Sequence, residues 1–151
     1  NRFFIVFRNS SNATQGSIAM SGRTNVSFNQ SSDYRLKENE IIISDGITRI
    51  KKLKARRFNF KDEPTVTRDG FFAHEVSSVV PEAITGEKDE MKAETFYEDG
   101  DSIPSGKKIG DPKTYSSSEI QPQQIDQSKL VPLLVAGLQE LITRVENLES
   151  A

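Results

Sequence analysis

The chain has 151 residues, of which 34% are hydrophobic and 28% are charged, and its formal net charge is -2. It contains no cysteine, which excludes a disulfide framework and a thiolate metal site, and no apolar run approaches the roughly 18 residues that cross a bilayer. This length fits one domain or a small domain with extensions, and the low hydrophobic fraction suggests apolar surface buried between subunits. No membrane, metal or cofactor is therefore expected as a partner.

Residues 1–31 read as short strands and turns with few charges. The run at 3–7 is β-prone, residues 9–12 have turn chemistry, and further strands are expected at 16–20 and 26–28. Strands this short form a poor independent domain and suit the end of an interwoven β-stalk.

From Asp33 onward the sequence becomes charged and amphipathic. Ser44 is a candidate N-cap for a short helix that carries Ile47, Ile50 and Leu53 on one face. This change of pattern predicts that a small mixed α/β domain follows the strands.

The middle of the chain predicts a strand followed by a long arm. An alternating strand is expected at 57–61, with turns at 63–64 and 69–70. The element that follows, through Val79 and Val80, should end at Pro81. Residues 85–125 are rich in Gly, Pro, Ser and charge, which is typical of a partly ordered loop or arm.

The C-terminal stretch has the clearest periodicity in the sequence. Ser128 is the predicted N-cap of a helix from about 129 to 149, roughly 30 Å long, with Pro132 in its first turn. Apolar residues at spacings of 3 and 4 form a heptad seam, which predicts self-association without fixing the number of chains. The seam residues are Val131, Leu134, Leu138, Leu141, Val145 and Leu148.

A basic run and a lone histidine offer alternative sites. A polyanion could bind the run, but its alternation with apolar residues favours a solvated helix face, so nucleic acid is not expected as a partner. For His74, the only histidine, we favour a structural or interface role. The basic residues are Arg49, Lys51, Lys52, Lys54, Arg56 and Arg57.

Five ordered blocks resemble a known family. They are SSDYRLKEN at 31–39, ISDGI at 43–47, GFFAHEV at 70–76, VPEA at 80–83 and IDQSKLVPLL at 125–134. Together they resemble the C-terminal intramolecular chaperone domain of phage endosialidases, tailspikes, tail fibres and neck appendages, which also occurs in myelin regulatory transcription factors. The resemblance covers roughly 28–150, and the loop at 87–122 matches poorly.

The resemblance implies a homotrimer that aligns three chains, helps the upstream stalk of the same polypeptide to fold, and is then released by self-cleavage. The cut falls between Ser31 and Ser32, with Ser32 as nucleophile and Lys37 as general base. It further implies assembly in a host cytoplasm and a place in the virion tail, with the released fragment absent from the mature particle.

The chemistry of such a dyad sets conditions on the fold. A lysine amine accepts the serine proton only when neutral, which burial or nearby positive charge favours, and Arg35 is a candidate cationic neighbour. Asn39 or backbone N–H groups could stabilise the oxyanion. Residues five apart face opposite sides of a strand, so Ser32 and Lys37 meet only if a turn intervenes or another chain supplies the partner.

The sequence thus predicts an α+β homotrimer. A β-stalk end at 1–31 precedes a chaperone domain at 32–151, whose trimerising helix lies at about 129–149. The alternative is a permanent trimerisation foot or receptor-binding tip that is never cleaved.

Overall fold

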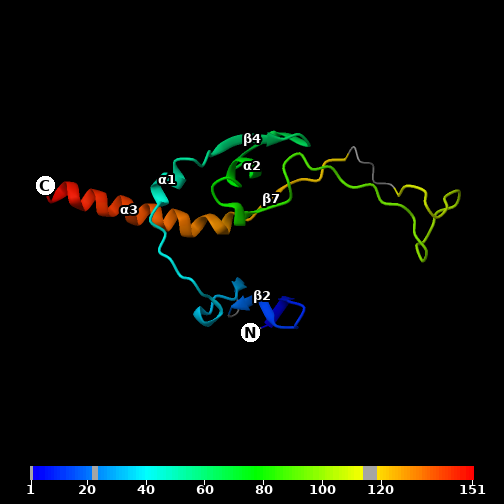
Figure 1. Ribbon diagram of the computed structural model, residues 1–151, viewed down its shortest axis with the longest axis horizontal. Coiled ribbons are helices and arrows are strands. Elements are labelled where there is room, and N and C mark those ends of the chain that lie inside the picture. The colour runs from blue at the N-terminus through cyan, green and yellow to red at the C-terminus, as the bar shows by residue number, and fades with distance from the viewer. Residues whose placement is uncertain (1, 22–23, 114–118) are drawn as a thin grey trace. The chain divides into compact units, whose positions relative to one another are not determined.

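The computed structural model describes residues 2–21, 24–113 and 119–151 (Figure 1). The chain divides into two compact units, Asn1–Ile42 and Ile43–Ala151. Small antiparallel sheets and helices occur together, so the predicted α+β class is confirmed.

The first unit is a three-stranded antiparallel sheet in the order β1-β2-β3. Its strands are β1 (Arg2–Arg8), β2 (Thr14–Ser21) and β3 (Asn25–Gln30), which confirms the strands predicted in this region. The predicted turn also forms, because the Asn9 side chain accepts hydrogen bonds from the N–H groups of Ser11 and Ala13. Asn12 completes the turn with a left-handed backbone at φ 62°.

This sheet covers little of its own apolar surface. Ser17 and Ala19 of β2 are buried, whereas Phe4, Phe7 and Phe28 expose 63%, 55% and 78% of their surface. Large aromatic side chains are rarely left so open in a finished core. The sheet therefore lacks a covering layer within its own unit.

The second unit contains most of the regular structure. Its elements, in chain order, are α1 (Gly46–Ile50), β4 (Arg56–Phe60), β5 (Glu63–Gly70), α2 (Ala73–Val76), a 3₁₀ turn (Pro81–Ala83), β6 (Ile84–Thr85), β7 (Gln124–Ile125), a 3₁₀ turn (Gln127–Leu130) and α3 (Val131–Glu149). Strands β4 and β5 pair as one antiparallel hairpin, and β6 pairs with β7.

The hydrophobic core of this unit joins the middle of the chain to its C-terminal helix. Its buried members come from α2, the link that follows it, the two 3₁₀ turns and the start of α3, and Ile50 and Leu53 pack against them. The buried residues are Val76, Val79, Val80, Ala83, Leu130 and Leu133. The core therefore depends on contacts between residues about 50 positions apart.

Between β6 and β7, residues 86–113 and 119–123 extend away from the core as an arm (Figure 1). Isolated bridges join Met91 to Ile120 and Phe96 to Pro112, so the two legs of the arm run antiparallel. The expected partly ordered arm is thus confirmed in the residues that the structure describes.

Several local predictions were wrong. The turns expected at 63–64 and 69–70 lie inside β5, and the hairpin turns instead at Lys61 and Asp62. An edge strand accepts Pro64 because its missing N–H costs no ladder bond there. Ser44 does not cap α1, and the helix ends at Ile50, before Leu53.

Ser128 is also not the N-cap of α3. It lies in the 3₁₀ turn that leads into the helix, where its N–H and hydroxyl both donate to the Asp126 carboxylate at 3.0 and 2.6 Å. A carboxylate is a stronger acceptor than a hydroxyl, so Asp126 takes the capping role. Pro132 lies in the first turn of α3, as predicted.

Helix α3 is held against α1 by a close crossing and a long-range cap. The Glu140 carboxylate of α3 accepts hydrogen bonds from the N–H groups of Gly46 and Ile47 at 2.5 and 3.2 Å. These N–H groups have no partner within α1, so the cap completes the helix start. A carboxylate from 94 positions away does what Ser44 was expected to do.

Candidate functional site

Ser31 is fixed at the end of the three-stranded sheet. Its N–H donates to the Gln15 carbonyl at 2.9 Å, and its hydroxyl donates to the Thr14 carbonyl at 3.2 Å. Both acceptors belong to β2, so Ser31 extends the pairing of β3 by one residue. The Ser31 carbonyl, which the predicted cut would involve, is therefore part of ordered backbone.

A 3₁₀ turn (Tyr34–Leu36) follows directly. Asp33 caps it, because its carboxylate accepts from the Arg35 N–H at 2.9 Å and its carbonyl accepts from the Leu36 N–H at 3.1 Å. The Lys37 N–H donates to the Tyr34 carbonyl at 3.0 Å, which closes the turn. An Asp at this position is a strong capping residue, since its short side chain reaches the next free N–H groups.

The turn brings Ser32 and Lys37 together. The Lys37 Nζ donates a hydrogen bond to the Ser32 Oγ at 2.8 Å. This distance lies within the range over which a proton can pass between two side chains. Of the two arrangements that the spacing allowed, an intervening turn within one chain is the one that the structure adopts.

Both residues of this pair are exposed in the single chain. A lysine amine can take the serine proton only in its neutral form, which burial favours. The arrangement therefore has the geometry of a nucleophile and base, while the single chain does not supply the burial that a neutral amine requires.

The two predicted supporting residues take different places. The Arg35 guanidinium binds the Asp33 carboxylate through two nitrogens, at 3.0 and 2.6 Å. Hydrogen bonds from Arg35, together with the charge of Lys37, lower the pKa of Asp33. Asn39 takes a left-handed backbone at φ 56°, and its side chain makes no hydrogen bond to Ser32 or Lys37 in the described part of the chain.

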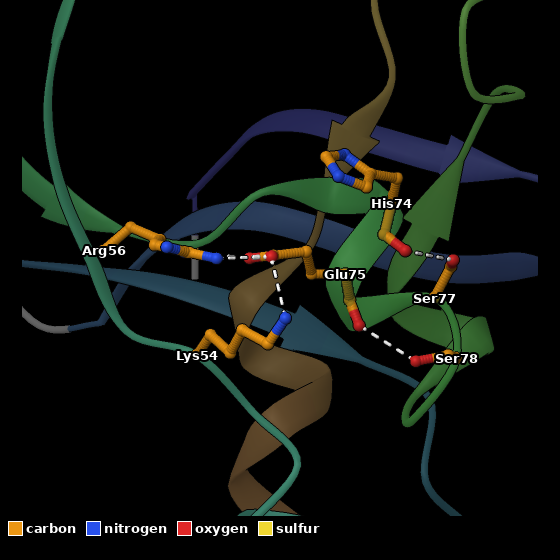
Figure 2. Close-up of polar contacts among 6 residues, drawn as sticks. All are labelled: Lys54, Arg56, His74, Glu75, Ser77 and Ser78. Atoms are coloured by element: carbon orange, nitrogen blue, oxygen red, sulfur yellow. Dashed lines mark hydrogen bonds and ion pairs between the residues drawn. The ribbon is translucent and has the colours of Figure 1, made fainter.

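The basic run does not form the predicted helix face, because α1 ends at Ile50 and β4 begins at Arg56, and four of its six residues have partners within the fold. Lys54 and Arg56 both bind the Glu75 carboxylate, at 3.2 and 2.5 Å, as Figure 2 shows. Arg49 donates to the Val79 carbonyl at 2.6 Å, and Arg57 pairs with Asp69 at 2.7 Å. Four of the six basic side chains are thus directed at partners inside the domain, and the expectation that the run binds no polyanion stays a prediction.

His74 lies beside this cluster on α2 (Figure 2). Its ring stacks on Phe72 with centroids 6.0 Å apart, and Arg56 lies over the same Phe72 ring at 5.6 Å. Within 2–21, 24–113 and 119–151, no group of His, Cys, Asp and Glu is arranged to hold a metal ion. No described helix is long and apolar enough to cross a membrane.

The predicted seam of α3 lies on the exposed side of that helix. Leu133, Ala136 and Gly137 are buried against the core and α1, whereas each of the six seam residues exposes between 44% and 78% of its surface. Val135 and Ile142 widen this exposed apolar surface at 48% and 47%. A single chain therefore leaves the seam uncovered.

Sequence reasoning missed the two groups that order the site. The capping role of Asp33 could have been predicted, because an Asp side chain often accepts a hydrogen bond from the N–H two residues later and so starts a turn. The hydrogen bonds from Ser31 to Thr14 and Gln15 could not have been predicted, because they depend on the pairing register of β2 and β3.

Comparison with known proteins identifies a family for part of the chain. Residues 32–85 match the model of a family described as the chaperone of endosialidase, and the match begins at Ser32. No curated protein matches the chain. A chaperone of endosialidase domain therefore occupies residues 32–85 and includes both Ser32 and Lys37.

Proposed function

Because residues 32–85 are a chaperone of endosialidase domain, we propose that this chain is an intramolecular chaperone that cuts itself free from the stalk it assembles. Three copies align through α3, the upstream strands fold as a tail-fibre or tailspike stalk, and the bond between Ser31 and Ser32 is then cleaved. The family match is the observation that carries this proposal.

The cleavage step uses the pair formed by Ser32 and Lys37. Lys37 Nζ removes the Ser32 hydroxyl proton, and the Ser32 Oγ attacks the carbonyl carbon of Ser31. The C–N bond breaks, the Ser32 nitrogen takes a proton, and an ester now joins Ser31 to the Ser32 oxygen. Water hydrolyses this ester to a Ser31 carboxylate and restores the Ser32 hydroxyl.

Assembly supplies what the single chain lacks at this site. Lys37 is exposed in one chain, and covering it between chains favours the neutral amine that can act as base. Cleavage therefore follows trimer formation. This order protects the stalk, because an early cut would remove the alignment before the strands had paired.

The trimer itself rests on the exposed seam of α3. Six apolar residues at heptad spacing remain open to solvent, and such a seam is covered when helices pack side by side. Joining three chains at one foot raises their effective concentration, so strands from different chains meet at a lower entropic cost.

The three-stranded sheet fits the stalk end that this function requires. Phe4, Phe7 and Phe28 are exposed and gain a covering layer if strands of three chains interleave. The product is a folded stalk in a virion tail, assembled in the host cytoplasm. The released foot is absent from the mature particle, which makes stalk folding hard to reverse.

The test is a mass measurement on freshly made protein. Wild type should yield a fragment that begins at Ser32, and Ser32→Ala or Lys37→Ala should abolish it. Lys52→Ala is the matched control, since Lys52 is an exposed lysine outside the site, and it should be cleaved like wild type. Continued cleavage of this bond in both site variants would falsify the dyad.

The rival function predicts a different result in the same experiment. A permanent trimerisation foot or receptor-binding tip gives an intact chain on a denaturing gel, together with a stable trimer in light scattering. Cleaved wild type excludes it.

A further inference from the structure

The pair formed by Asp33 and Arg35 lies between the two residues of the dyad in sequence. Arg35 contacts both carboxylate oxygens of Asp33, with Nε at 3.0 Å from Oδ1 and Nη2 at 2.6 Å from Oδ2. A fork-to-fork contact of this kind takes about two of the roughly four acceptor positions of a carboxylate. The Asp33 Oδ1 atom also accepts a hydrogen bond from the backbone N–H of Arg35, at 2.9 Å.

Lys37 is the other cation whose charge acts on this carboxylate. Its charge contributes to lowering the pKa of Asp33, so the two groups interact electrostatically. An ammonium prefers a carboxylate to a neutral hydroxyl when both are available. Lys37 nevertheless donates to the Ser32 Oγ at 2.8 Å. The carboxylate beside it is already occupied by Arg35.

We propose that Arg35 is a positioning residue, which occupies the Asp33 carboxylate and so leaves Lys37 free to bind Ser32. Asp33 builds the turn that brings the dyad together, but its charge also competes for the base. Arg35 removes that competition without touching Ser32 or Lys37 itself. This role rests on the proposed self-cleavage. It differs from the role predicted from the sequence, in which the positive charge of Arg35 acts directly on Lys37 and favours its neutral form.

The proposal gives a pH dependence with a defined sign. Without Arg35, Lys37 pairs with Asp33, and a neighbouring negative charge favours the protonated amine. Cleavage should then require a higher pH. Asp33 and Arg35 are the charged groups that interact with this turn. Glu38 and Glu40 follow in the chain, and neither forms an ion pair among the described residues.

The experiment measures cleavage of the full 151-residue chain after cell-free synthesis into denaturant and refolding at pH 6 to 10. Arg35→Gln should slow cleavage at pH 7 about tenfold and recover at higher pH, since a charge pair of this kind shifts protonation by one unit or more. Adding Asp33→Asn should restore the rate at pH 7, because an Asn still caps the turn but carries no charge.

A matched control comes from the β4–β5 hairpin. Arg57 makes the same two-nitrogen contact with Asp69, at 2.7 and 2.8 Å, and its side chain is 74% exposed compared with 73% for Arg35. Arg57→Gln should leave the cleavage rate and its pH profile unchanged. An equal slowing by both variants means that loss of any such ion pair has the same effect, and overturns the proposal.

Two further outcomes also overturn it. One is a wild-type rate for Arg35→Gln across the pH range, and the other is a double variant no faster than Arg35→Gln alone. Sedimentation of each variant shows whether it assembles. If Arg35→Gln does not assemble, Asp33→Asn alone decides, because it should cleave at about the wild-type rate and its inactivity refutes the role of Arg35.

The same set of variants distinguishes a failure of the Arg35 proposal from a failure of the proposed cleavage mechanism. Ser32→Ala and Lys37→Ala are included throughout. Cleavage that persists in these two variants overturns the proposed function itself. Cleavage that stops in them and is unaffected by Arg35→Gln overturns only the positioning role.

Discussion

Gly46 lies where α1 crosses α3, and a single methyl group there should separate the two helices. A Cβ at Gly46 would lie 2.7 Å from both the Ala136 carbonyl carbon and the Gly137 Cα, and closer still to the Gly137 nitrogen. These atoms belong to helix backbone and cannot rotate away. Ordinary contact requires α1 to move by about 1 Å, because carbon atoms pack near 3.5 Å or more.

The energetic cost has two parts. Overpacking of this kind costs about 1–3 kcal/mol. Movement of α1 also weakens the hydrogen bonds from Gly46 and Ile47 to Glu140, and a bond to a charged group contributes about 1.5–3 kcal/mol. If half of one such bond is lost, Gly46→Ala lowers the free energy of unfolding by about 2–4 kcal/mol.

Gly137→Ala is the matched control at the same crossing. Its added Cβ meets the Ile50 Cδ1 atom first, which is the end of a flexible side chain, and its next neighbours lie 3.3 and 3.5 Å away. Alanine in a helix interior gains about 1 kcal/mol over glycine, which offsets the cost of moving Ile50. We therefore expect Gly137→Ala to change stability by less than about 1 kcal/mol.

The assay is urea unfolding of both variants in a Ser32→Ala background, which prevents cleavage. Protein concentration is held fixed, because assembly makes stability depend on it. With a urea dependence of about 2 kcal/mol per molar, Gly46→Ala should lower the midpoint by about 1–2 M. A midpoint equal to that of the parent, or a larger loss in Gly137→Ala, refutes the reasoning.

Two further predictions concern assembly and acid stability. Leu138→Asp should break the trimer and stop cleavage although Ser32 and Lys37 are intact, with little recovery at pH 9–10. Sedimentation beside a cleavage time course checks this, and a monomer that cleaves at the wild-type rate contradicts it. The hydrogen bond from Arg56, helped by Lys54, lowers the pKa of Glu75 from 4.5 to about 2. The resulting stability is complete above pH 4.5 and lost as the pH falls toward 2. Glu75→Gln should therefore lose less stability than its parent between pH 5 and 3, which urea midpoints at each pH measure; an equal loss excludes this role.

Elements set by local pattern could be predicted from the sequence. The three strands of the first unit follow β-prone runs separated by Asn and Gly turns, and α3 follows a regular apolar repeat. Each depends mainly on residues close in the chain. The arm at 86–123 is likewise predicted by its composition.

Features set by distant contacts could not be predicted. The start of α1 is capped by Glu140, and β5 runs through residues 63–70 because β4 pairs with it. Neither partner can be identified from local propensity. Sequence reasoning required a turn or a second chain to bring Ser32 and Lys37 together, and the Asp33 cap of that turn carries a local signal. The bonds that hold Ser31 to β2 depend on the strand register and are visible only in the structure.

The two halves of α3 differ in how much of their surface the single chain covers. Buried residues occur only in its first half, where Leu133 and Ala136 pack on the core, and all residues from 141 to 149 are exposed. An isolated stretch of about nine residues is too short to hold a helix in water by itself. In the proposed trimer, packing along the seam through Leu141, Val145 and Leu148 supplies the missing stabilisation. We infer that assembly and ordering of this end are one event. A substitution at Leu148 should thus weaken the trimer without disturbing the core around Leu133.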